Sequence, residues 1–334
     1  MPRTTLKDVA DHVGVSAKTV SNVVNGTGWV TDELRERVRA ALVELGYRPN
    51  VAARQLRSGR SGMIALAIPE LSQPYFAELA SELVRAAQER SITVLVNQTD
   101  GRADAERRIS DGIDAPVMDG LIMSPLALNA RDLEGRLDST PLVLLGEHIG
   151  DSTFPHVTVD NTAAAKAATM HLLDQGCRRI AAIGAQSSGP NETSVLRLAG
   201  YSAALQEAGI EVDDRLIVHV EEYHRADGAA GAHRLIDDGV EVDGVFAFND
   251  LLALGAMHVL VTSGIRVPED VAVIGFDDID EARYSTPALS SVSPDTAALA
   301  RKAIDLLFED QPTHGMHTVG HSIAHRASTR GASE

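Results

Sequence analysis

The sequence predicts two kinds of structure in one chain: a small all-α head with a helix-turn-helix, and an α/β body of two doubly wound parallel-sheet lobes. Three short amphipathic helices separated by turn residues occupy positions 1–46. From residue 63 onward, apolar strands alternate with amphipathic helices, which is typical of a parallel sheet covered on both faces. With 334 residues, of which 44% are hydrophobic, the chain is long enough for a head and a two-lobed body.

The first helix of the head is predicted to begin after Thr5. Thr5 is followed three residues later by Asp8, which is the pattern of a capping box. Val9 and its neighbours at helical spacing give the helix an apolar face, and Gly14 suits the tight turn that follows. Ser16 then caps a second helix, so that two helices meet at a steep angle.

The second helix is the candidate for reading DNA, because in a helix-turn-helix it lies in the major groove. Its outward side chains near the N-terminus are candidates for contacts with base edges. A third helix beginning at Thr31 closes the apolar core, and Gly46 ends it. An ordinary helical bundle would share the core but not the turn glycine and the polar outward face. The base-reading candidates are Ala17, Lys18 and Asn22, and the phosphate-contact candidates include Thr5, Ser16, Thr19 and Ser21.

Charge is distributed unevenly along the chain. The formal net charge of -17 argues against nonspecific nucleic-acid binding by the whole surface. Residues 1–62 hold ten Lys or Arg and six Asp or Glu, a net charge of +4, which leaves -21 for the remainder. Positive charge is therefore concentrated where DNA would bind. The acidic body would repel phosphates, or it serves solubility alone.

The motifs of the head, and of the segment after it, resemble the LacI/GalR (lactose-repressor) family, and the likeness runs nearly to the C-terminus. The resemblance implies a bacterial transcription regulator, usually a repressor. Such a regulator binds a palindromic operator in double-stranded DNA as a homodimer, and a small effector changes its affinity. The resemblance adds Asn25, Tyr47, Asn50, Ala53 and Arg54 to the DNA-binding residues. The motifs are Thr5-Leu6-Lys7-Asp8-Val9-Ala10, Val15-Ser16, Thr19-Val20-Ser21, Val24-Asn25-Gly26, Leu45-Gly46-Tyr47-Arg48-Pro49-Asn50 and Ala52-Ala53-Arg54-Gln55-Leu56.

Residues 47–62 are predicted to form a hinge. Pro49 breaks the third helix, and residues 51–57 would form a helix too short to be stable alone in water. A segment that folds only when two copies pack together on DNA couples the body's conformation to DNA affinity. Leu56 matches the family's leucine that wedges into the minor groove at the operator centre, and apolar wedges kink DNA. The alternative is a simple linker with an incidental leucine.

The body, residues 63–334, is predicted from two series of apolar strands. The resemblance implies the periplasmic-binding-protein fold, in which the chain crosses between lobes near Asp160, near Ser291-Val292 and near Ser322-Ile323. The lobes are then residues 63–160 with 293–322, and residues 161–292 with 323–334, and the ligand lies between them. The predicted strands are 63–69, 92–97, 120–124, 141–146 and 157–160, followed by 179–184, 216–220, 244–249 and 271–277.

Candidate effector-binding residues follow the carboxyl ends of these strands, where open α/β sheets bind ligands. Tyr75 and Phe76 come after the first strand, and their faces suit a sugar ring or a flat base. Acids and amides after later strands can hydrogen-bond hydroxyl groups. Core packing is the alternative for Phe76, and strand-end capping for Asp250. The candidates are Tyr75, Phe76, Glu147, Asp160, Asn249 and Asp277, to which the resemblance adds Arg197 and Tyr223.

These residue types favour a sugar as effector. Aromatic faces with many neutral or acidic acceptors suit a polyhydroxyl ligand, whereas a phosphorylated metabolite would favour more Lys or Arg. A purine, used by one relative in the family, is a further alternative. Several relatives carry an aspartate where this chain has Gly146, with Glu147 one position later; since a one-residue slip reverses side-chain direction, the sequence leaves the orientation of Glu147 open. We expect the effector to release DNA.

Other classes of protein are disfavoured. The chain has no G-x-G-x-x-G opening a helix, no Walker lysine motif and no G-x-S-x-G after a strand, so we expect neither an enzyme nor a cofactor. A solute-binding protein for transport would lack the DNA-binding head. No apolar run has membrane-spanning length and the N-terminus lacks a signal peptide, so we expect a cytoplasmic protein without membrane association.

Cysteine and histidine point to no special chemistry. The single cysteine, Cys177, cannot form an internal disulfide, and we interpret it as a packed small residue. His317, His321 and His325, with His314 before them, suggest a metal site. In an extended segment they would stand too far apart for one tetrahedral ion, since a strand rises about 3.3 Å per residue. We therefore expect no bound metal.

Overall fold

The computed structural model describes residues 4–47, 60–114, 117–149, 153–187, 192–310 and 313–331. It divides the chain into two compact units, Met1–Ser61 and Gly62–Glu334. Four residues predicted to contact DNA from the hinge, Asn50, Ala53, Arg54 and Leu56, lie outside the described residues. Among the described residues, no helix has both the length and the apolar character needed to cross a membrane.

The head is a bundle of three helices. Thr5 caps the first helix in a capping box with Asp8, while Ser16 and Thr31 cap the second and the third. Gly14 ends the first helix with a φ of 75°, a left-handed conformation that glycine adopts without steric cost. The predicted caps and core are confirmed. The helices are α1 (Leu6–Val13), α2 (Ala17–Asn25) and α3 (Asp32–Glu44), and the core contains Val9, Ala10, Val13, Val20, Val38 and Ala41.

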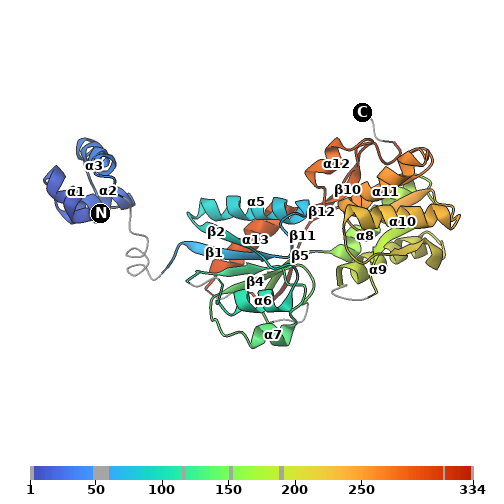
Figure 1. Ribbon diagram of the computed structural model, residues 1–334, viewed down its shortest axis with the longest axis horizontal. Helices are drawn as coiled ribbons and strands as arrows, with labels where there is room; N and C mark the ends of the chain where they lie inside the picture. Colours follow the sequence, from blue (N-terminus) through green and yellow to red (C-terminus); the bar gives the residue numbers. More distant parts are fainter. Residues whose placement is uncertain are drawn as a thin grey trace. The chain divides into compact units, whose positions relative to one another are not determined.

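The first lobe of the body is a six-stranded parallel sheet with the order β11-β5-β4-β3-β1-β2. Helices α5 (Pro74–Glu89) and α13 (Thr296–Phe308) cover one face, and α6 (Ala103–Ser110) and α7 (Ala130–Glu134) cover the other (Figure 1). Because both faces are covered, the central strands are apolar without interruption. The strands are β1 (Met63–Ile68), β2 (Thr93–Gln98), β3 (Leu121–Met123), β4 (Leu142–Leu145), β5 (Pro155–Val159) and β11 (Gly315–Val319).

The second lobe contains a six-stranded sheet with the order β12-β10-β9-β8-β6-β7. It is parallel except that β12 runs antiparallel to β10. Helices α8 and α9 pack together on one face and α10 and α11 on the other, as right-handed crossovers require (Figure 1). The strands are β6 (Ile180–Ala185), β7 (Ile217–His219), β8 (Gly244–Ala247), β9 (Ala272–Phe276), β10 (Ser290–Pro294) and β12 (His321–Ala324); the helices are α8 (Asn161–Asp174), α9 (Glu192–Glu207), a 3-10 turn (Asp214–Leu216), α10 (Arg225–Asp237), α11 (Asp250–Thr262) and α12 (Asp280–Tyr284).

Three strands, β10, β11 and β12, are absent from the sequence prediction. Ser291 and Val292, expected near a crossing between lobes, lie inside β10, and the chain crosses after Pro294. It crosses again at Gly320, between β11 and β12. These strands lack the apolar pattern because β10 is rich in serine, and because β11 and β12 are edge strands with half-buried or exposed residues.

Candidate functional site

The outward surface of α2 carries the residues predicted to read bases. Ala17 and Lys18 are exposed in its first turn, and Asn22 is half-buried just over one turn later. Ser16 Oγ accepts a hydrogen bond from the Thr19 amide at 3.1 Å and lies 2.9 Å from Thr19 Oγ1. Both hydroxyls therefore stand at the N-terminus of α2, where the helix dipole favours a phosphate.

Several other predicted DNA-binding side chains have partners within the head. Asn25 Nδ2 donates to the Ser21 carbonyl at 2.7 Å and to Ser21 Oγ at 3.0 Å. Thr5 Oγ1 donates to Asp8 at 2.8 Å within the capping box. Tyr47 is half-buried against the core of the head. The structure thus leaves Ala17 and Lys18 as the most open side chains of this group.

Trp29 is a further surface residue of the head that sequence reasoning missed. It is 89% exposed and is the single tryptophan of the chain. Gly28, just before it, has a φ of 72°, and a Cβ at that position would lie 2.7 Å from Asn22 Nδ2. The turn between α2 and α3 therefore lies against Asn22, which brings Trp29 beside the predicted DNA-reading surface. The sequence does contain a feature that could have identified Trp29 as a candidate contact residue. It is a single tryptophan in a polar turn, whereas large aromatic side chains are usually mostly buried.

A cleft of about 1280 Å³ lies between the two lobes of the body. Seven of the eight predicted effector-binding residues line it: Tyr75, Phe76, Glu147, Arg197, Tyr223, Asn249 and Asp277. Asp160 does not line the cleft. It is exposed, and its carboxylate caps α8 by accepting a hydrogen bond from the Ala163 amide at 2.9 Å. The next residue, Asn161, lines the cleft instead.

Arg197 is held in the cleft by three neighbours. Its Nε donates to Asn161 Oδ1 at 2.8 Å, and its Nη1 donates to the Phe248 carbonyl. The guanidinium also lies 3.5 Å from the centroid of the Phe276 ring, within the range of a cation–π interaction. Arg197 is 7% exposed, so its geometry is set before a ligand arrives. Its remaining N–H groups are suited to donate to ligand oxygens.

Asp277 follows β9 and is half-buried in the cleft. Its carboxylate has no hydrogen bond or ion pair with another described residue. Burial raises the pKa of Asp277 to about 7, although Arg197 acts in the opposite direction. Its φ of 111° is unusual for a residue other than glycine, and such strain concentrates at functional sites. An acceptor without a partner in a cleft is suited to bind hydroxyl groups of a ligand.

Glu147 faces the cleft, which answers the question that the sequence left open. Gly146, with a φ of 86°, turns the chain after β4. The Glu147 carboxylate accepts hydrogen bonds from Thr158 Oγ1 of the first lobe at 3.1 Å and from Thr193 Oγ1 of the second lobe. The neighbouring His148 also lines the cleft, and its Nε2 is buried without a partner in the described part of the chain.

Tyr75 and Phe76 give the cleft an aromatic wall. Their rings meet edge to face with centroids 5.2 Å apart, at the start of α5. Tyr223 lies across from them on the second lobe, and its hydroxyl donates to the Gly184 carbonyl at 2.9 Å. Burial raises the pKa of Tyr223 to about 12, so the hydroxyl stays protonated. These aromatic side chains suit the apolar face of a sugar ring.

Asn249 and Asp250 begin α11 and serve different purposes. Asn249 caps the helix through the Leu252 amide at 2.9 Å, and its Nδ2 donates to the Tyr223 carbonyl at 3.1 Å. Asp250 is fully buried and accepts hydrogen bonds from Ser291 Oγ at 2.6 Å and from the Ile279 amide at 3.0 Å. Burial raises the pKa of Asp250 well above its usual range. Asp250 is therefore a structural residue behind the cleft.

Polar contacts also join the two lobes along the cleft. Glu78 of α5 accepts a hydrogen bond from the amide of Asp280, which begins α12, at 2.9 Å. Burial raises the pKa of Glu78. Glu70 after β1 lies 3.1 Å from His224 Nε2, just before α10. The lobes therefore meet through side chains that a change in their relative position would separate.

The charge of the cleft lining is predominantly negative. The lining contains no lysine, and its two guanidinium groups belong to Arg197 and Arg234. Such a lining disfavours phosphorylated and carboxylated ligands. The carboxylates among the residues that line it are Glu70, Asp100, Glu147, Glu221, Glu222, Asp227 and Asp277.

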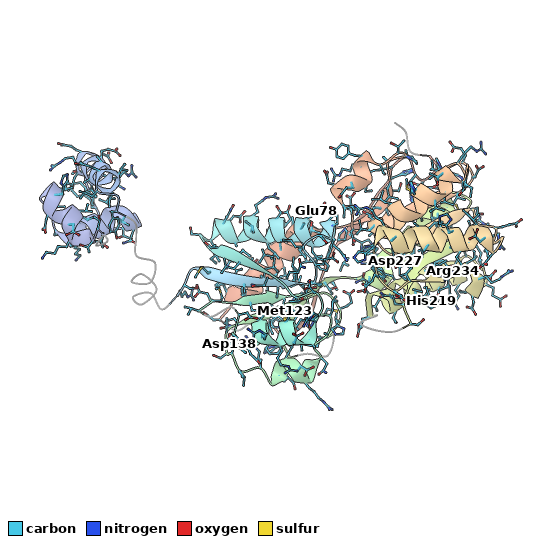
Figure 2. The ribbon with its side chains drawn as sticks, viewed as in Figure 1. Glu78, Met123, Asp138, His219, Asp227 and Arg234 are labelled. Atoms are coloured by element: carbon cyan, nitrogen blue, oxygen red, sulfur yellow. The ribbon has the colours of Figure 1, made fainter. Side chains whose placement is uncertain are left out.

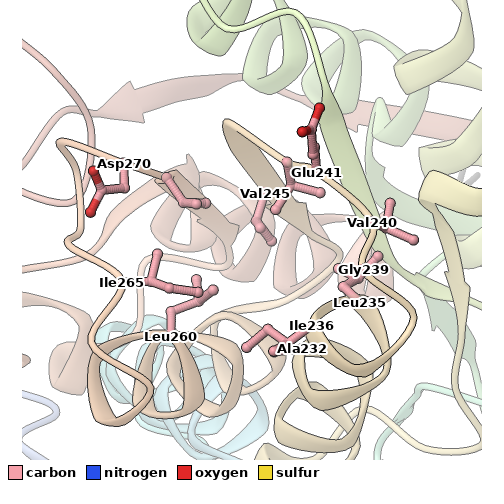
Figure 3. A pocket seen from close by; sticks show the side chains of 12 residues that line it. Ala232, Leu235, Ile236, Gly239, Val240, Glu241, Val245, Leu260, Ile265 and Asp270 are labelled. Carbon is pink, nitrogen blue, oxygen red and sulfur yellow. The ribbon is translucent and has the colours of Figure 1, made fainter.

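A second, smaller pocket of about 400 Å³ lies in the second lobe, away from the cleft (Figure 3). It is formed where α10 and α11 end and β8 and β9 begin, which is the opposite end of the strands from the cleft. Its lining is mostly aliphatic, including Leu235, Ile236 and Leu260, and it lacks converging polar groups. The cleft is therefore the better candidate for a ligand that hydrogen-bonds.

The C-terminal histidines are distributed over two sheets. His317 lies in β11 and His321 in β12, while the His325 ring lies 4.9 Å from the His171 ring. Across the described ranges, no three His, Cys, Asp or Glu side chains come together as a metal site. Cys177 is fully buried, as predicted, and its Sγ donates to the Asp243 carbonyl at 3.2 Å.

A helix-turn-helix head joined to a two-lobed α/β body with a polar cleft defines a DNA-binding regulator with a ligand-sensing body. Comparison with known families agrees. The model described as "Bacterial regulatory proteins, lacI family" matches residues 5–50, and the "Periplasmic binding protein-like domain" matches residues 169–329. The chain belongs to the LacI family of bacterial transcription regulators. It is a DNA-binding regulator of transcription and not an enzyme.

Individual relatives match over nearly the whole chain. The ribose operon repressor of Halalkalibacterium halodurans is 34% identical over 92% of each chain. The transcriptional regulator CelR of Thermobifida fusca is 36% identical, again over 92% of each. Among solved structures, a CelR–cellobiose complex has a TM-score of 0.70 at 31% identity, covering 98% of this chain and 100% of the other. The lac repressor dimer bound to operator and the anti-inducer ONPF has a TM-score of 0.84 at 26% identity, covering 98% and 99%.

Proposed function

We propose that this protein is a cytoplasmic repressor that binds a palindromic operator as a homodimer and releases it when a neutral sugar enters the cleft between the lobes. The observation that carries the proposal is the Asp277 carboxylate, which lies in the cleft beside Arg197 without a partner of its own in the described chain. Together they offer an acceptor and donors to the hydroxyl groups of one ligand. Among the relatives, four are named as ribose operon repressors, and one solved structure is a CelR–cellobiose complex.

The cleft chemistry favours a neutral sugar over the two alternatives. A phosphorylated effector would meet seven carboxylates and no lysine in the lining. A purine would use the aromatic wall, but it carries few hydroxyl donors for Asp277 and Glu147. Seven residues are proposed to contact the effector: Tyr75, Phe76, Glu147, Arg197, Tyr223, Asn249 and Asp277.

On the DNA side, we propose that Ala17, Lys18 and Asn22 contact base edges and that the hydroxyls beside them contact phosphates. Trp29 joins this surface, because the turn that carries it lies against Asn22. Leu56 is proposed to wedge into the minor groove at the operator centre. With an operator selected from random duplexes, Leu56→Ala abolishes specific binding in a gel-shift assay; unchanged binding would contradict this role.

The proposed dimer uses the free edge of the first lobe. Strand β2 is an edge strand, and its Leu95 and Val96 are each 40% exposed. Exposed apolar side chains on an edge strand are a liability unless another chain covers them. We expect Val96→Asp to shift the protein from dimer to monomer in sedimentation equilibrium. Val195→Asp, at an exposed position of α9, is the matched control.

The effector is tested by a thermal-shift screen of the full chain with mono- and disaccharides, sugar phosphates and purines. A ligand present at a hundred times its dissociation constant adds about 2.7 kcal/mol of stability. We expect stabilisation by a neutral sugar that disappears in Asp277→Ala, and release of operator DNA by the same sugar. Stabilisation by purines or sugar phosphates alone would overturn the sugar proposal, and stronger operator binding with the sugar would overturn induction.

A further inference from the structure

Asp277 and Asp278 form a bend after β9 that has an unusual backbone. Asp277 has a φ of 111° and Asp278 has a φ of 55°, and both angles lie in the left-handed region that residues with a Cβ rarely adopt. Such a conformation persists only where the surrounding structure holds it in place. The bend therefore depends on its neighbours, because its own residues disfavour it.

Three consecutive amides of this bend have acceptors in the second lobe. The first amide donates to the Val292 carbonyl of β10 at 2.9 Å. The Asp278 amide donates to Ser291 Oγ, also of β10, at 3.0 Å. The Ile279 amide donates to Asp250 Oδ2 at 3.0 Å. The backbone of the bend is thus held by β10 and by the first residue of α11.

Ser291 and Asp250 form a buried pair behind the bend. Ser291 Oγ donates to Asp250 Oδ1 at 2.6 Å while it accepts from the Asp278 amide, and both side chains are fully buried. Gly275 of β9 leaves space for the pair, since a Cβ there would lie 2.1 Å from Asp250 Oδ1. Arg326 separately holds the side chain of Asp278. Because the pair is buried, a backbone amide that lost its acceptor there would be left unsatisfied.

Neither Ser291 nor Asp250 lines the cleft, whereas Asp277 does. The pair can therefore influence a ligand only through the bend that it holds. We propose that Ser291 and Asp250 are positioning residues of the effector site, which keep the bend in its left-handed conformation and thereby hold the Asp277 carboxylate in the cleft. The inference rests on the proposed function, in which Asp277 binds hydroxyl groups of a sugar.

The test is isothermal titration calorimetry of the full chain with ribose, glucose, galactose, xylose, maltose and cellobiose. For each sugar that binds wild type, we expect Ser291→Ala to lower the affinity about tenfold, because the Asp278 amide loses its acceptor. Asp250→Ala removes the acceptor of the Ile279 amide and lowers the affinity by a similar factor. Asp250→Asn keeps an oxygen at that position and retains the affinity within about threefold of wild type.

Ser328→Ala is the matched control for the loss of a buried hydroxyl. Ser328 is fully buried, and its Oγ accepts from the Ser290 amide at 2.7 Å and donates to the Val273 carbonyl at 2.6 Å. It resembles Ser291 in accepting a backbone amide, but these partners lie outside the bend. We expect Ser328→Ala to bind the same sugars within about twofold of wild type. The midpoint of urea unfolding shows that each variant is folded under the conditions of the titration.

The pH dependence of binding separates a positioning role from a general loss of packing. A sugar hydroxyl donates more strongly to Asp277 when the carboxyl is ionised. Since its pKa lies at about 7, we expect wild-type affinity to rise about tenfold between pH 6 and pH 8. Arg197 lowers this pKa, whereas Glu147 and Glu78, which Figure 2 labels on α5, raise it; all three remain in every variant. In Ser291→Ala the rise should fall below about threefold, because the released carboxyl no longer meets the sugar.

The inference is overturned, and the proposed function is left intact, if Ser291→Ala and Asp250→Ala both bind sugar as tightly as wild type. A loss of affinity in Ser291→Ala that keeps the full rise between pH 6 and pH 8 also overturns it, because the effect would then not pass through Asp277. An equal loss in Ser328→Ala would assign the effect to packing alone. If wild type binds no saccharide at all, the proposed function itself fails, and this inference fails with it.

Discussion

Asp277, a proposed effector-binding residue, reduces the stability of the protein without ligand. Its carboxylate is half-buried, its backbone is in a left-handed conformation, and no described side chain donates to it. The folded protein therefore holds a proton at Asp277 up to about pH 7, whereas an unfolded chain releases it near pH 4. The ionised group opposes folding, and a ligand hydroxyl relieves that cost by donating to it.

Replacing Asp277 with asparagine is expected to stabilise the protein without ligand. At pH 8 the native carboxylate is ionised and its cost is fully present, so Asp277→Asn should raise the free energy of unfolding by about 1–3 kcal/mol. The difference from wild type shrinks as the pH falls from about 7 toward about 4, and it disappears below about pH 4, where the carboxyl is protonated in both states. Urea unfolding between pH 4 and pH 8 measures this. Asp237→Asn, at an exposed position of α10, is the control.

Trp29 is both a proposed contact and a probe for DNA binding. Because it is the single tryptophan and is 89% exposed, intrinsic emission reports on this one position. We expect operator DNA to change that emission, and Trp29→Ala to weaken binding about fivefold. The magnitude corresponds to burial of roughly 50 Å² of ring at about 25 cal/mol per Å², or about 1 kcal/mol. Emission that stays constant on saturation with operator would place Trp29 outside the interface.

Among the elements, the pairing of α10 with α11 depends on two glycines. A Cβ at Gly228 of α10 would lie 2.1 Å from the Leu252 carbonyl oxygen, and a Cβ at Gly255 of α11 would lie 2.0 Å from the Arg225 carbonyl oxygen. Both obstacles are backbone, so no side chain can move aside. The two helices pack so closely that only glycine, whose side chain is a hydrogen atom, fits at these two positions.

Gly255→Ala should therefore destabilise the second lobe. Overpacking typically costs about 1–3 kcal/mol, and we expect the upper end of that range because the backbone must shift. The measurement is the midpoint of urea unfolding for the full chain. Gly320→Ala is the control, since a Cβ there meets nothing within 4 Å. Equal stability of the two variants would contradict the close approach of α10 and α11.

The elements also show which parts of the fold the sequence predicts. Caps with a side-chain partner, such as Thr5 with Asp8, and fully buried strands, such as β1 and β9, follow from local patterns. Strands β10 to β12 do not, because β10 is rich in serine and because β11 and β12 are edge strands whose residues are half-buried or exposed. Asp160 and Asp277 both follow strands. The Asp160 carboxylate, however, caps helix α8 by accepting a hydrogen bond from the nearby Ala163 amide. Strand-end position identifies candidates, and only the structure shows which side chains already have partners.

At the scale of the whole molecule, we propose that the contacts between lobes link effector binding to conformation. Glu147 accepts hydrogen bonds from Thr158 of one lobe and Thr193 of the other, while it also lines the cleft. His148 lies 2.8 Å from Glu192 in the same region. A sugar that binds Glu147 therefore competes or cooperates with a contact between lobes. An effector shifts a conformational equilibrium only through such differences in affinity between two arrangements.

Thr193→Val tests this link, because it removes the hydroxyl that joins α9 to Glu147 and keeps the size of the side chain. We expect the factor by which saturating effector lowers operator affinity to change by roughly 2- to 30-fold, which corresponds to about 0.5–2 kcal/mol of coupling. The variant and wild type should share the same salt dependence of operator binding, since the phosphate contacts of the head are untouched. Thr262→Val, outside the cleft lining, is the control. Coupling is reciprocal, so operator DNA must change effector affinity by the same factor in each variant. The proposal would be contradicted if, in Thr193→Val, the effect of effector on operator affinity and the effect of operator on effector affinity both matched wild type within twofold. The contact between Glu147 and Thr193 would then contribute nothing to the coupling.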